Sequence, residues 1–237
     1  MSDLQQLAVD AVERAMKSGA TDAECTISEG SEFSAGVRMR ELETITDAGS
    51  RGAGIRVLIG QRAGSAYTSD LSSEGIATMV RSALELARIT SEDPHAGLPA
   101  AEDLGMFRGD LALHDEAIAK MEAEWKIAQA KLAEEAALNF DPRIENSKGG
   151  SFDSYLGAHY FANSRGFAGS YRTSSCALSV SPVAKQNGSM ERDYWHTAAR
   201  CAAQTPPGLS GSALSADSSG AEPAPPRAVL RPQRIRA

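Results

Sequence analysis

The chain has 237 residues, enough for one large domain or two small ones, and folded chains of this size bury roughly 70% of their unfolded surface. The formal net charge is −7, which argues against nucleic acid as a direct partner because phosphate binding depends on clustered Lys and Arg. The sequence has no secretory leader and no apolar run of ~18 residues. These features exclude a membrane partner and predict a cytoplasmic protein.

A helix and a set of strands are predicted in the first third of the chain. Apolar residues recur at helical spacing from Leu4 to Ala15, and Gly19 is suited to end the helix. The period changes to two from Ala23 to Thr68, which predicts four or five short antiparallel strands. Turns between them are expected at Glu29-Gly30, around Arg40-Glu41, from Asp47 to Gly54 and at Gly60-Gln61.

Two more helices are predicted in the middle of the chain. One begins at 70–74 and ends near Thr90, and a connector that contains Asp93-Pro94 and Leu98-Pro99 follows it. The longer helix spans His114 to Leu138 and stops at Asp141-Pro142. Its apolar side is expected to hold Ile118, Met121, Trp125, Ala128, Leu132 and Ala136.

A glycine-rich sheet is predicted over residues 149–194. Alternating aromatic and small residues surround the turn signals Asn163-Ser164-Arg165-Gly166 and Gln186-Asn187-Gly188-Ser189, which indicates three or four antiparallel strands. The fold class is therefore α+β, with helices packed on antiparallel sheet. We expect an N-terminal α+β domain at 1–140, the glycine-rich sheet at 141–200 and a tail at 201–237.

The tail differs in composition from the rest of the chain. It holds six of the ten prolines, no Lys and no aromatic residue, and four Arg against two acidic residues. Such a segment cannot build a core. Two alternatives are open: a disordered C-terminal extension, or a shift of the reading frame near Arg200 that leaves a truncated protein.

No catalytic motif is found among the histidines. His95, His114, His159 and His196 are far apart in the sequence, so the paired spacing that holds zinc on a helix is absent. His114 lies in His114-Asp115-Glu116, which favours a helix cap with solvated charge. His159 and His196 lie in predicted strands and are expected to be structural.

The other candidate motifs also favour structural roles. Gly52-Ala53-Gly54 precedes a strand rather than a helix, so it predicts a turn into a strand and not a dinucleotide loop. Cys25, Cys176 and Cys201 have no flanking motif and are expected to be buried thiols, and Trp125 is expected in the core. We therefore predict no catalytic, cofactor-binding or metal-binding residue in this chain.

Several stretches in the same order along residues 4–200 resemble the TldD/PmbA family, on its PmbA (TldE) branch. The family was once named modulators of DNA gyrase and is related to metalloproteases. The matching stretches are Gly54–Val57, Gly64–Ser72, Ala87–Leu98, Arg143–Phe152, Ala162–Phe167 and Asn187–Tyr194. None of them is a catalytic signature; the resemblance depends on their number and order.

The resemblance implies the N-terminal part of a protein about twice this long. In this family the TldD subunit carries an H-E-x-x-x-H zinc motif, whereas PmbA-like subunits lack it and pair with TldD in degrading unfolded peptides. It therefore implies a subunit of a zinc metallopeptidase, here without the C-terminal half, non-catalytic alone and with zinc in the partner. Two alternatives are a peptide-binding module that works by strand addition and a nonfunctional truncation product.

Overall fold

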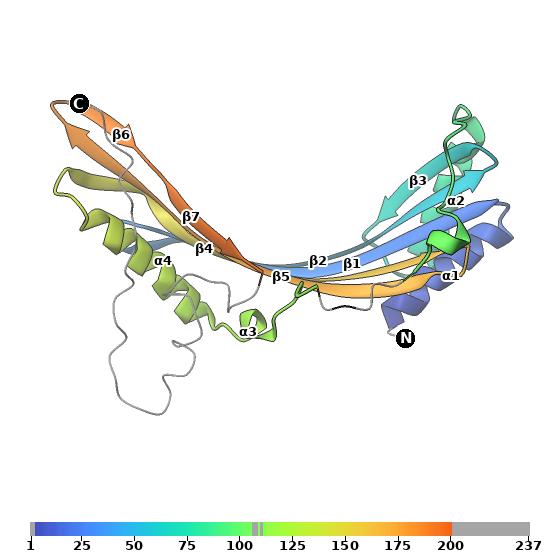
Figure 1. Cartoon of the computed structure of the whole chain (residues 1–237), viewed down its shortest axis with the longest axis horizontal. Coiled ribbons are helices and arrows are strands. Elements are labelled where there is room, and N and C mark those ends of the chain that lie inside the picture. Colours follow the sequence, from blue (N-terminus) through green and yellow to red (C-terminus); the bar gives the residue numbers. More distant parts are fainter. Residues whose placement is uncertain (1–2, 106–108, 110, 201–237) are drawn as a thin grey trace. The chain divides into compact units, whose positions relative to one another are not determined.

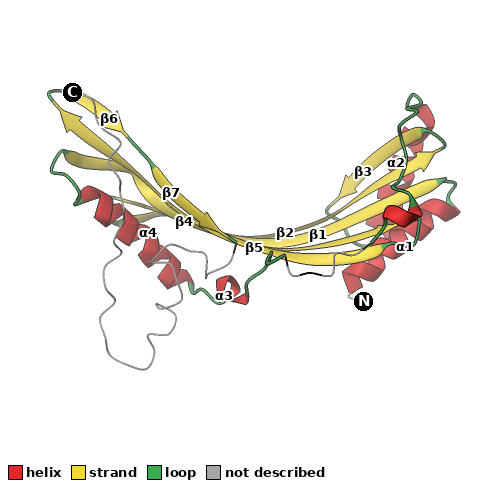
Figure 2. Cartoon of the chain, viewed as in Figure 1, coloured by secondary structure: helices red, strands yellow, loops and turns green. Residues whose placement is uncertain are grey.

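The computed structural model of the chain describes residues 3–105, 109 and 111–200. Helices and antiparallel strands occur together, so the predicted α+β class is confirmed (Figures 1 and 2). The tail at 201–237 lies outside the described residues. The helices are α1 (Asp3–Lys17), α2 (Ser73–Ile89), the short 3-10 helix η1 (Ala101–Asp103), α3 (Glu116–Ala119) and α4 (Ala123–Leu138). The strands are β1 (Asp22–Arg38), β2 (Glu41–Ile59), β3 (Arg62–Thr68), β4 (Ile144–Asn163), β5 (Ala168–Gln186), β6 (Ser189–Arg192) and β7 (Trp195–Ala199).

The strands form one hydrogen-bonded sheet in the order β3-β2-β1-β4-β5-β6, and β7 also pairs with β5. Strand β2 pairs antiparallel with β3 from Ala53↔Thr68 to Ile59↔Arg62. Strand β5 pairs antiparallel with both β6 and β7 along different stretches of its length. The predicted antiparallel strands after residue 149 are thus confirmed.

Two compact units divide the described residues. The first unit comprises the described residues of 3–31, 49–111 and 157–172, and the second those of 32–48, 112–156 and 173–200. Strands β1, β2, β4 and β5 contribute residues to both units. The domain boundary expected between residues 140 and 141 remains a prediction.

The first unit has its core between the sheet and helices α1 and α2. The predicted apolar stripes are buried in both helices: α2 contacts β3, and α1 contacts α2. Gly64 of β3 lies where the strand passes closest to α2, because a Cβ atom there would stand 2.1 Å from the Ala83 carbonyl oxygen. The buried apolar residues of the helices are Ala8, Ala11, Val12 and Ala15 of α1 and Ile76, Met79, Val80, Ala83, Leu84 and Ala87 of α2.

The second unit has a separate core under α3 and α4. Phe152 and Ile118 are its largest fully buried apolar side chains. Trp125 packs its ring edge-on against Phe152, with centroids 5.7 Å apart, which places it at the core as predicted. The two units thus each bury their own apolar surface.

The single helix predicted over His114–Leu138 is wrong, because the structure has two helices there. Helix α3 ends at Ala119, and Glu122 adopts an extended conformation (φ −67°, ψ 149°) before α4 starts. Met121, between the helices, is 5% exposed and belongs to the core. Because Met121 is buried in the turn between the two helices, the spacing of apolar residues along the sequence resembles that of one continuous helix.

The predicted apolar side of the longer helix is wrong for most of α4, although Trp125 packs at the core. Leu132, expected inside, is 40% exposed. The buried face instead carries Lys126, Ala130, Glu134 and Ala137, so two charged residues point inward. A pattern based on hydrophobicity cannot identify a face whose buried members are charged.

Glu134 is fully buried because it binds the turn between β1 and β2. Its Oε1 accepts a hydrogen bond from the Met39 N–H at 2.9 Å, and its Oε2 accepts one from the Arg40 N–H at 2.7 Å. Both turn residues have left-handed backbones (φ 50° and 70°), which cost non-glycine residues free energy. The two charge-assisted hydrogen bonds offset that cost and join α4 to the turn.

The four or five short strands predicted over residues 23–68 are three strands, of which β1 and β2 are long and β3 is short. The turns expected around Arg40-Glu41 and at Gly60-Gln61 are confirmed, the first lying at Met39-Arg40, whereas those expected at Glu29-Gly30 and from Asp47 to Gly54 are wrong. Gly30 and Gly49 meet instead in neighbouring strands, where a Cβ atom on Gly49 would lie 3.8 Å from the Gly30 carbonyl oxygen. Gly52-Ala53-Gly54 likewise lies inside β2 rather than in a turn. Glycine inside a strand gives the same sequence signal as glycine in a turn.

The two turns predicted after residue 149 are both confirmed. Asn163 orders the first, because its Oδ1 accepts hydrogen bonds from the N–H groups of Arg165 (3.0 Å) and Phe167 (3.1 Å). In the second, Asn187 (φ 51°) and Gly188 (φ 82°) take the left-handed conformation that a tight hairpin requires.

Candidate functional site

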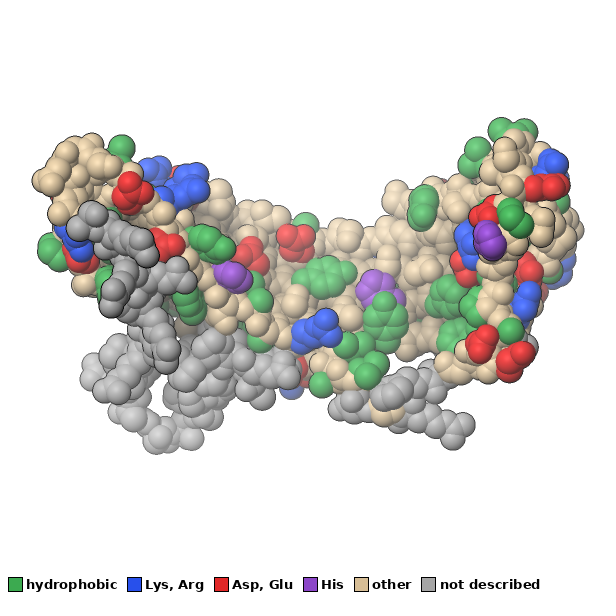
Figure 3. Space-filling model, turned by 45° about the horizontal axis from the view of Figure 1, so that its top comes forward, with side chains coloured by type: hydrophobic (Ala, Val, Ile, Leu, Met, Phe, Trp, Pro, Cys, Tyr) green, Lys and Arg blue, Asp and Glu red, His purple; other side chains and the backbone are tan. Residues whose placement is uncertain are grey.

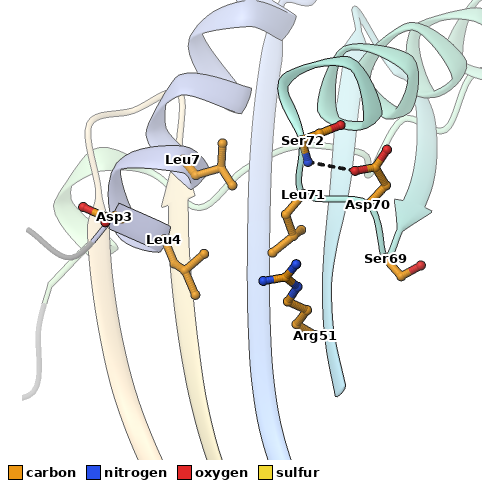
Figure 4. A pocket seen from close by; sticks show the side chains of 8 residues that line it. All are labelled: Asp3, Leu4, Leu7, Arg51, Ser69, Asp70, Leu71 and Ser72. Carbon is orange, nitrogen blue, oxygen red and sulfur yellow. Dashed lines mark hydrogen bonds between the residues drawn. The ribbon is translucent and has the colours of Figure 1, made fainter. Parts of the chain in front are cut away.

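A cavity of about 570 Å³ opens in the first unit beside the loop that joins β3 to α2 (Figure 4). Leu4 and Leu7 extend into it from α1 toward Leu71 of the loop and Arg51 of β2. The three leucines also pack against the core of the first unit. The other lining residues are Asp3, Ser69, Asp70 and Ser72.

The loop beside the cavity is held by short-range hydrogen bonds. The Thr68 hydroxyl accepts from the Asp70 N–H at 3.0 Å, and the Asp70 carboxylate accepts from the Ser72 N–H at 2.9 Å. Ser72 then caps α2, because its Oγ accepts from the Gly75 N–H at 3.1 Å. Ser, Thr and Asp residues, which favour turns and helix starts, thus hold this wall of the cavity in place. The helix start agrees with the one predicted at 70–74.

The Asp70 carboxylate is ionised at neutral pH. Hydrogen bonds from the Ser72 backbone N–H, then from its side chain, lower the pKa of Asp70, and the positive charge of Arg51 lowers it further. Asp3 adds a second carboxylate to the lining. The cavity thus combines apolar walls with both signs of charge at its rim.

This arrangement suits binding rather than covalent or proton-transfer chemistry. The Ser72 hydroxyl and the Asp70 carboxylate are both engaged in holding the loop, and the lining residues include no histidine or cysteine. Leucine side chains beside one guanidinium and two carboxylates are groups that receive an apolar segment of another molecule with polar or charged neighbours. The cavity is a candidate docking site.

None of the four histidines lines this cavity. His95 is exposed in the connector, and His114 precedes α3, where Asp115 caps the helix by accepting from the Ala117 N–H, as predicted. His159 stacks on Tyr171 with ring centroids 4.8 Å apart. His196 stacks on Tyr194 with centroids 5.8 Å apart. The structural role expected for His159 and His196 stays a prediction.

Neither described cysteine is placed for nucleophilic chemistry. Cys25 and Cys176 are buried, each in the core of a different unit, and burial raises the pKa of the Cys25 thiol to about 12. Cys201 lies outside the described residues. Within residues 3–105, 109 and 111–200, no three His, Cys, Asp or Glu side chains are grouped so that they could hold a metal ion.

We expect the buried Cys25 thiol to make the protein less stable in alkali. The folded state keeps the proton up to about pH 12, whereas the unfolded thiol releases it near 9.0, so the folded state binds more protons between these values. Stability should therefore fall as pH rises above 9, by up to roughly 1.4 kcal/mol per pH unit. Urea unfolding at pH 8 and pH 10 measures this.

The matched variant for that measurement is Cys25→Ala. Its stability is lower at pH 8 because a buried sulfur is lost, but its loss between pH 8 and pH 10 should be smaller than that of the native chain. An identical alkaline loss in both proteins contradicts the role given to Cys25.

The sequence did not reveal all of the residues that build this site. Arg51 lies within a stretch expected to be a turn, and only the continuous strand β2 places it beside the cavity. Arg56 pairs with Glu24 at 2.6 Å in the same unit, and Figure 3 shows acidic and basic side chains mixed on the face it draws. Cross-strand register decides such pairs, and register cannot be deduced when the turns are placed wrongly.

Known protein families match this chain in sequence. Two family models match in order: the PmbA/TldA metallopeptidase domain 1 over residues 23–87, and the PmbA/TldA metallopeptidase central domain over residues 116–214. The Escherichia coli O157:H7 protein named Metalloprotease PmbA is 40% identical over 195 residues, which are 81% of this chain. The chain belongs to the TldD/PmbA family.

Other TldD/PmbA relatives agree in sequence and in fold. The Metalloprotease PmbA homolog of Haemophilus influenzae is 36% identical over 84% of this chain, and the chain spans 43% of the length of both curated relatives. A modulator of DNA gyrase from Bacteroides thetaiotaomicron superposes with a TM-score of 0.78 at 23% identity. The match covers 85% of this chain and 46% of the Bacteroides chain. TldE from Thermococcus kodakarensis superposes with a TM-score of 0.72 at 15% identity, and the match covers 82% of this chain and 43% of the TldE chain. At these identities the two structures establish the fold alone.

The described helices of this TldD/PmbA member include none that is long and apolar enough to cross a membrane.

Proposed function

We propose that the chain is a PmbA/TldE-like, non-catalytic subunit of a TldD-type zinc metallopeptidase that degrades peptides in the cytoplasm. The observation that carries this proposal is the presence of two successive PmbA/TldA domains in one chain that is 40% identical to a protein named Metalloprotease PmbA. The partner is a TldD-like subunit and the substrates are unfolded peptides. The chain spans less than half of its curated relatives, so this role is the one proposed for the whole protein.

Zinc belongs to the TldD-like partner in this proposal. The donor sets of the described residues do not fit the ion, because no three candidate ligands are grouped there. In this proposal the chain supplies a binding surface to the complex. The cavity between Leu4, Leu71 and Arg51 offers apolar contact and charges of both signs to a partner segment or to a peptide passing toward the metal.

A second candidate function is peptide binding by strand addition without a peptidase partner. Strand β3 pairs with β2 only from Ala53 onward, so the stretch of β2 from Glu41 to Ala48 in the second unit has β1 on one side and no described strand on the other. Leu42 and Ile45 on this edge are 42% and 54% exposed. An extended peptide could pair with such an edge through its main chain.

Co-purification tests the first proposal. A full-length version, made by joining residues 1–200 to the remainder of the Escherichia coli relative, is co-expressed with a tagged TldD-type subunit. We expect the two chains to elute together from size-exclusion chromatography in a fixed ratio. The unmodified Escherichia coli relative serves as the positive control.

Two outcomes decide between the candidates. If the joined protein elutes alone while the relative forms the complex, the subunit proposal fails. Binding of a reduced, carboxymethylated protein by the chain without any partner, weakened by Ile45→Lys, supports the second candidate, since a charge on an edge strand opposes pairing.

A further inference from the structure

The β2 edge, as we call residues 41–48 of β2, is a free sheet edge in the second unit. Strand β3 pairs with β2 only from Ala53 onward, so the β2 edge has β1 on one side and no described strand on the other. Every residue of this stretch is exposed. The outward N–H and C=O groups of such an edge are a template for a further strand.

The side chains of the β2 edge divide into an acidic face and a neutral face. Phe33 of β1 is buried on the side of α4, where the Lys126 amine lies 4.5 Å from the centre of its ring. Gly36 points the other way, and a Cβ atom on it would meet the Thr44 hydroxyl, so Thr44 lies on the face away from α4. Because side chains alternate along a strand, the face toward α4 holds Glu41, Glu43, Ile45 and Asp47, and the opposite face holds Leu42, Thr44 and Thr46.

The acidic face keeps much of its charge unpaired. None of Glu41, Glu43 and Asp47 forms an ion pair with a described residue. The charge of Asp47 acts on the buried lysine amine of α4, so this carboxylate is partly offset. Of the nearby basic residues, Arg40 belongs to the turn, and Arg38 donates from its Nε to a backbone carbonyl of β4 at 3.2 Å. A strand with positive charges at alternate positions complements this face.

We propose that the β2 edge binds an extended peptide segment in which Lys or Arg alternates with β-branched or apolar residues. The peptide main chain pairs with the outward backbone groups of the edge. Its basic side chains lie beside Glu41 and Glu43, and an apolar side chain covers Ile45. The proposal rests on the second candidate function, strand addition at this edge, and adds the chemistry of the strand that is bound.

A second copy of this chain is a poorer occupant of the edge. Two β2 edges paired with each other would bring both sets of three carboxylates, from Glu41, Glu43 and Asp47, onto one face of the joined sheet. Like charges that face each other across strands are destabilising. The same acidic face that attracts a basic strand therefore opposes self-association.

Protection against aggregation does not account for the whole pattern. Charged side chains on an edge strand do prevent unwanted pairing. Leu42 and Ile45 are nevertheless exposed on this edge, one on each face, and β-branched residues stand between the charges. These side chains favour strand pairing and offer apolar contact on both faces of an added strand.

Fluorescence polarisation with labelled heptapeptides and the full chain tests the proposal. The probe is Lys-Thr-Ile-Thr-Lys-Val-Lys with both ends blocked, and the matched control is Glu-Thr-Ile-Thr-Glu-Val-Glu. We expect the basic probe to bind saturably and at least tenfold more tightly than the acidic one. The difference should shrink at high salt, because salt screens exposed charges.

Alternate N-methylation shows whether the probe binds as a strand. One version of the basic probe is methylated on its odd amides and the other on its even amides. Only alternate amides of an added strand donate to the neighbouring strand, so one version should bind like the unmodified probe and the other should not bind. Equal behaviour of the two versions overturns strand pairing.

Reversing the charge of the edge should reverse its preference. In the double variant Glu41→Lys with Glu43→Lys, we expect the acidic probe to bind more tightly than the basic one. Glu85→Lys is the matched control, because Glu85 is exposed on α2 in the first unit, and it should keep the preference for the basic probe. All three positions are exposed, so both proteins should retain the native thermal transition.

Three outcomes overturn the proposal. If Gln-Thr-Ile-Thr-Gln-Val-Gln binds as tightly as the basic probe, the edge does not select charge, although strand addition stands. If no probe binds, the proposal fails, and Ile45-dependent binding of a reduced, carboxymethylated protein would then leave the second candidate function intact. If the chain elutes as a dimer that Ile45→Lys dissociates, the edge belongs to a second copy.

Discussion

Replacing Glu134 by Ala is expected to lower the free energy of unfolding by roughly 3 kcal/mol. The change removes the acceptors for the Met39 and Arg40 N–H groups, at 2.9 and 2.7 Å, and leaves a left-handed turn without its support. Each hydrogen bond to a charged group contributes roughly 1.5–3 kcal/mol, and a buried unpaired N–H adds a penalty. Urea unfolding followed by tryptophan fluorescence measures this, because Trp125 and Trp195 both belong to the second unit.

Glu135→Ala is the control for that measurement. Glu135 lies next along α4 but is exposed, so its removal should change the stability by no more than roughly 0.5 kcal/mol. Glu134→Gln should fall between the two, because one amide oxygen can still accept a single N–H. If Glu134→Ala and Glu135→Ala unfold at the same urea concentration, the carboxylate does not hold the turn.

Gly64→Ala is expected to destabilise the first unit by roughly 3 kcal/mol. The added Cβ would stand 2.1 Å from the Ala83 carbonyl oxygen and 2.5 Å from the Ala87 nitrogen, both backbone atoms of α2. Backbone cannot move aside as a side chain can, so β3 and α2 must separate. Overpacking of a core commonly costs roughly 1–3 kcal/mol, and this contact belongs at the upper end. Circular dichroism at 222 nm during thermal unfolding reports the loss.

Gly97→Ala provides the matched comparison, because a Cβ atom there meets nothing within 4 Å. We expect its melting temperature to stay within about 2 °C of the native value. A Gly64→Ala protein that melts together with Gly97→Ala would show that α2 does not approach β3 as closely as the structure places it.

Much of the fold could be predicted from the sequence where local chemistry and tertiary packing agree. Helices α1 and α2 have alanine-rich stripes that are buried, and the Ser72 cap and the Asn163 and Asn187-Gly188 turns carry their own signals. These features depend on neighbouring residues along the chain. Pattern reasoning is sufficient for them.

The wrong predictions arise where distant residues decide. Glycines at 30 and 49 lie in adjacent strands, so their local turn preference is overridden by pairing. Glu134 is buried on α4 only because a turn almost a hundred residues earlier needs an acceptor. Locating the cavity beside Arg51 requires the register of β2. The Nδ2 donor of Asn163, unpaired among the described residues, can be identified only from the contacts in the folded chain. Family resemblance located none of these contacts.

Peptide cleavage by the TldD-type partner tests the central proposal most directly. An unfolded protein substrate is incubated with the zinc-loaded TldD-type subunit, with and without the joined full-length version that carries residues 1–200. The proposal predicts that the joined protein cleaves nothing alone and raises the cleavage rate of its partner at least tenfold. A rate unchanged by its addition, while the Escherichia coli relative raises it under the same conditions, would contradict the assignment of this chain as a peptidase subunit.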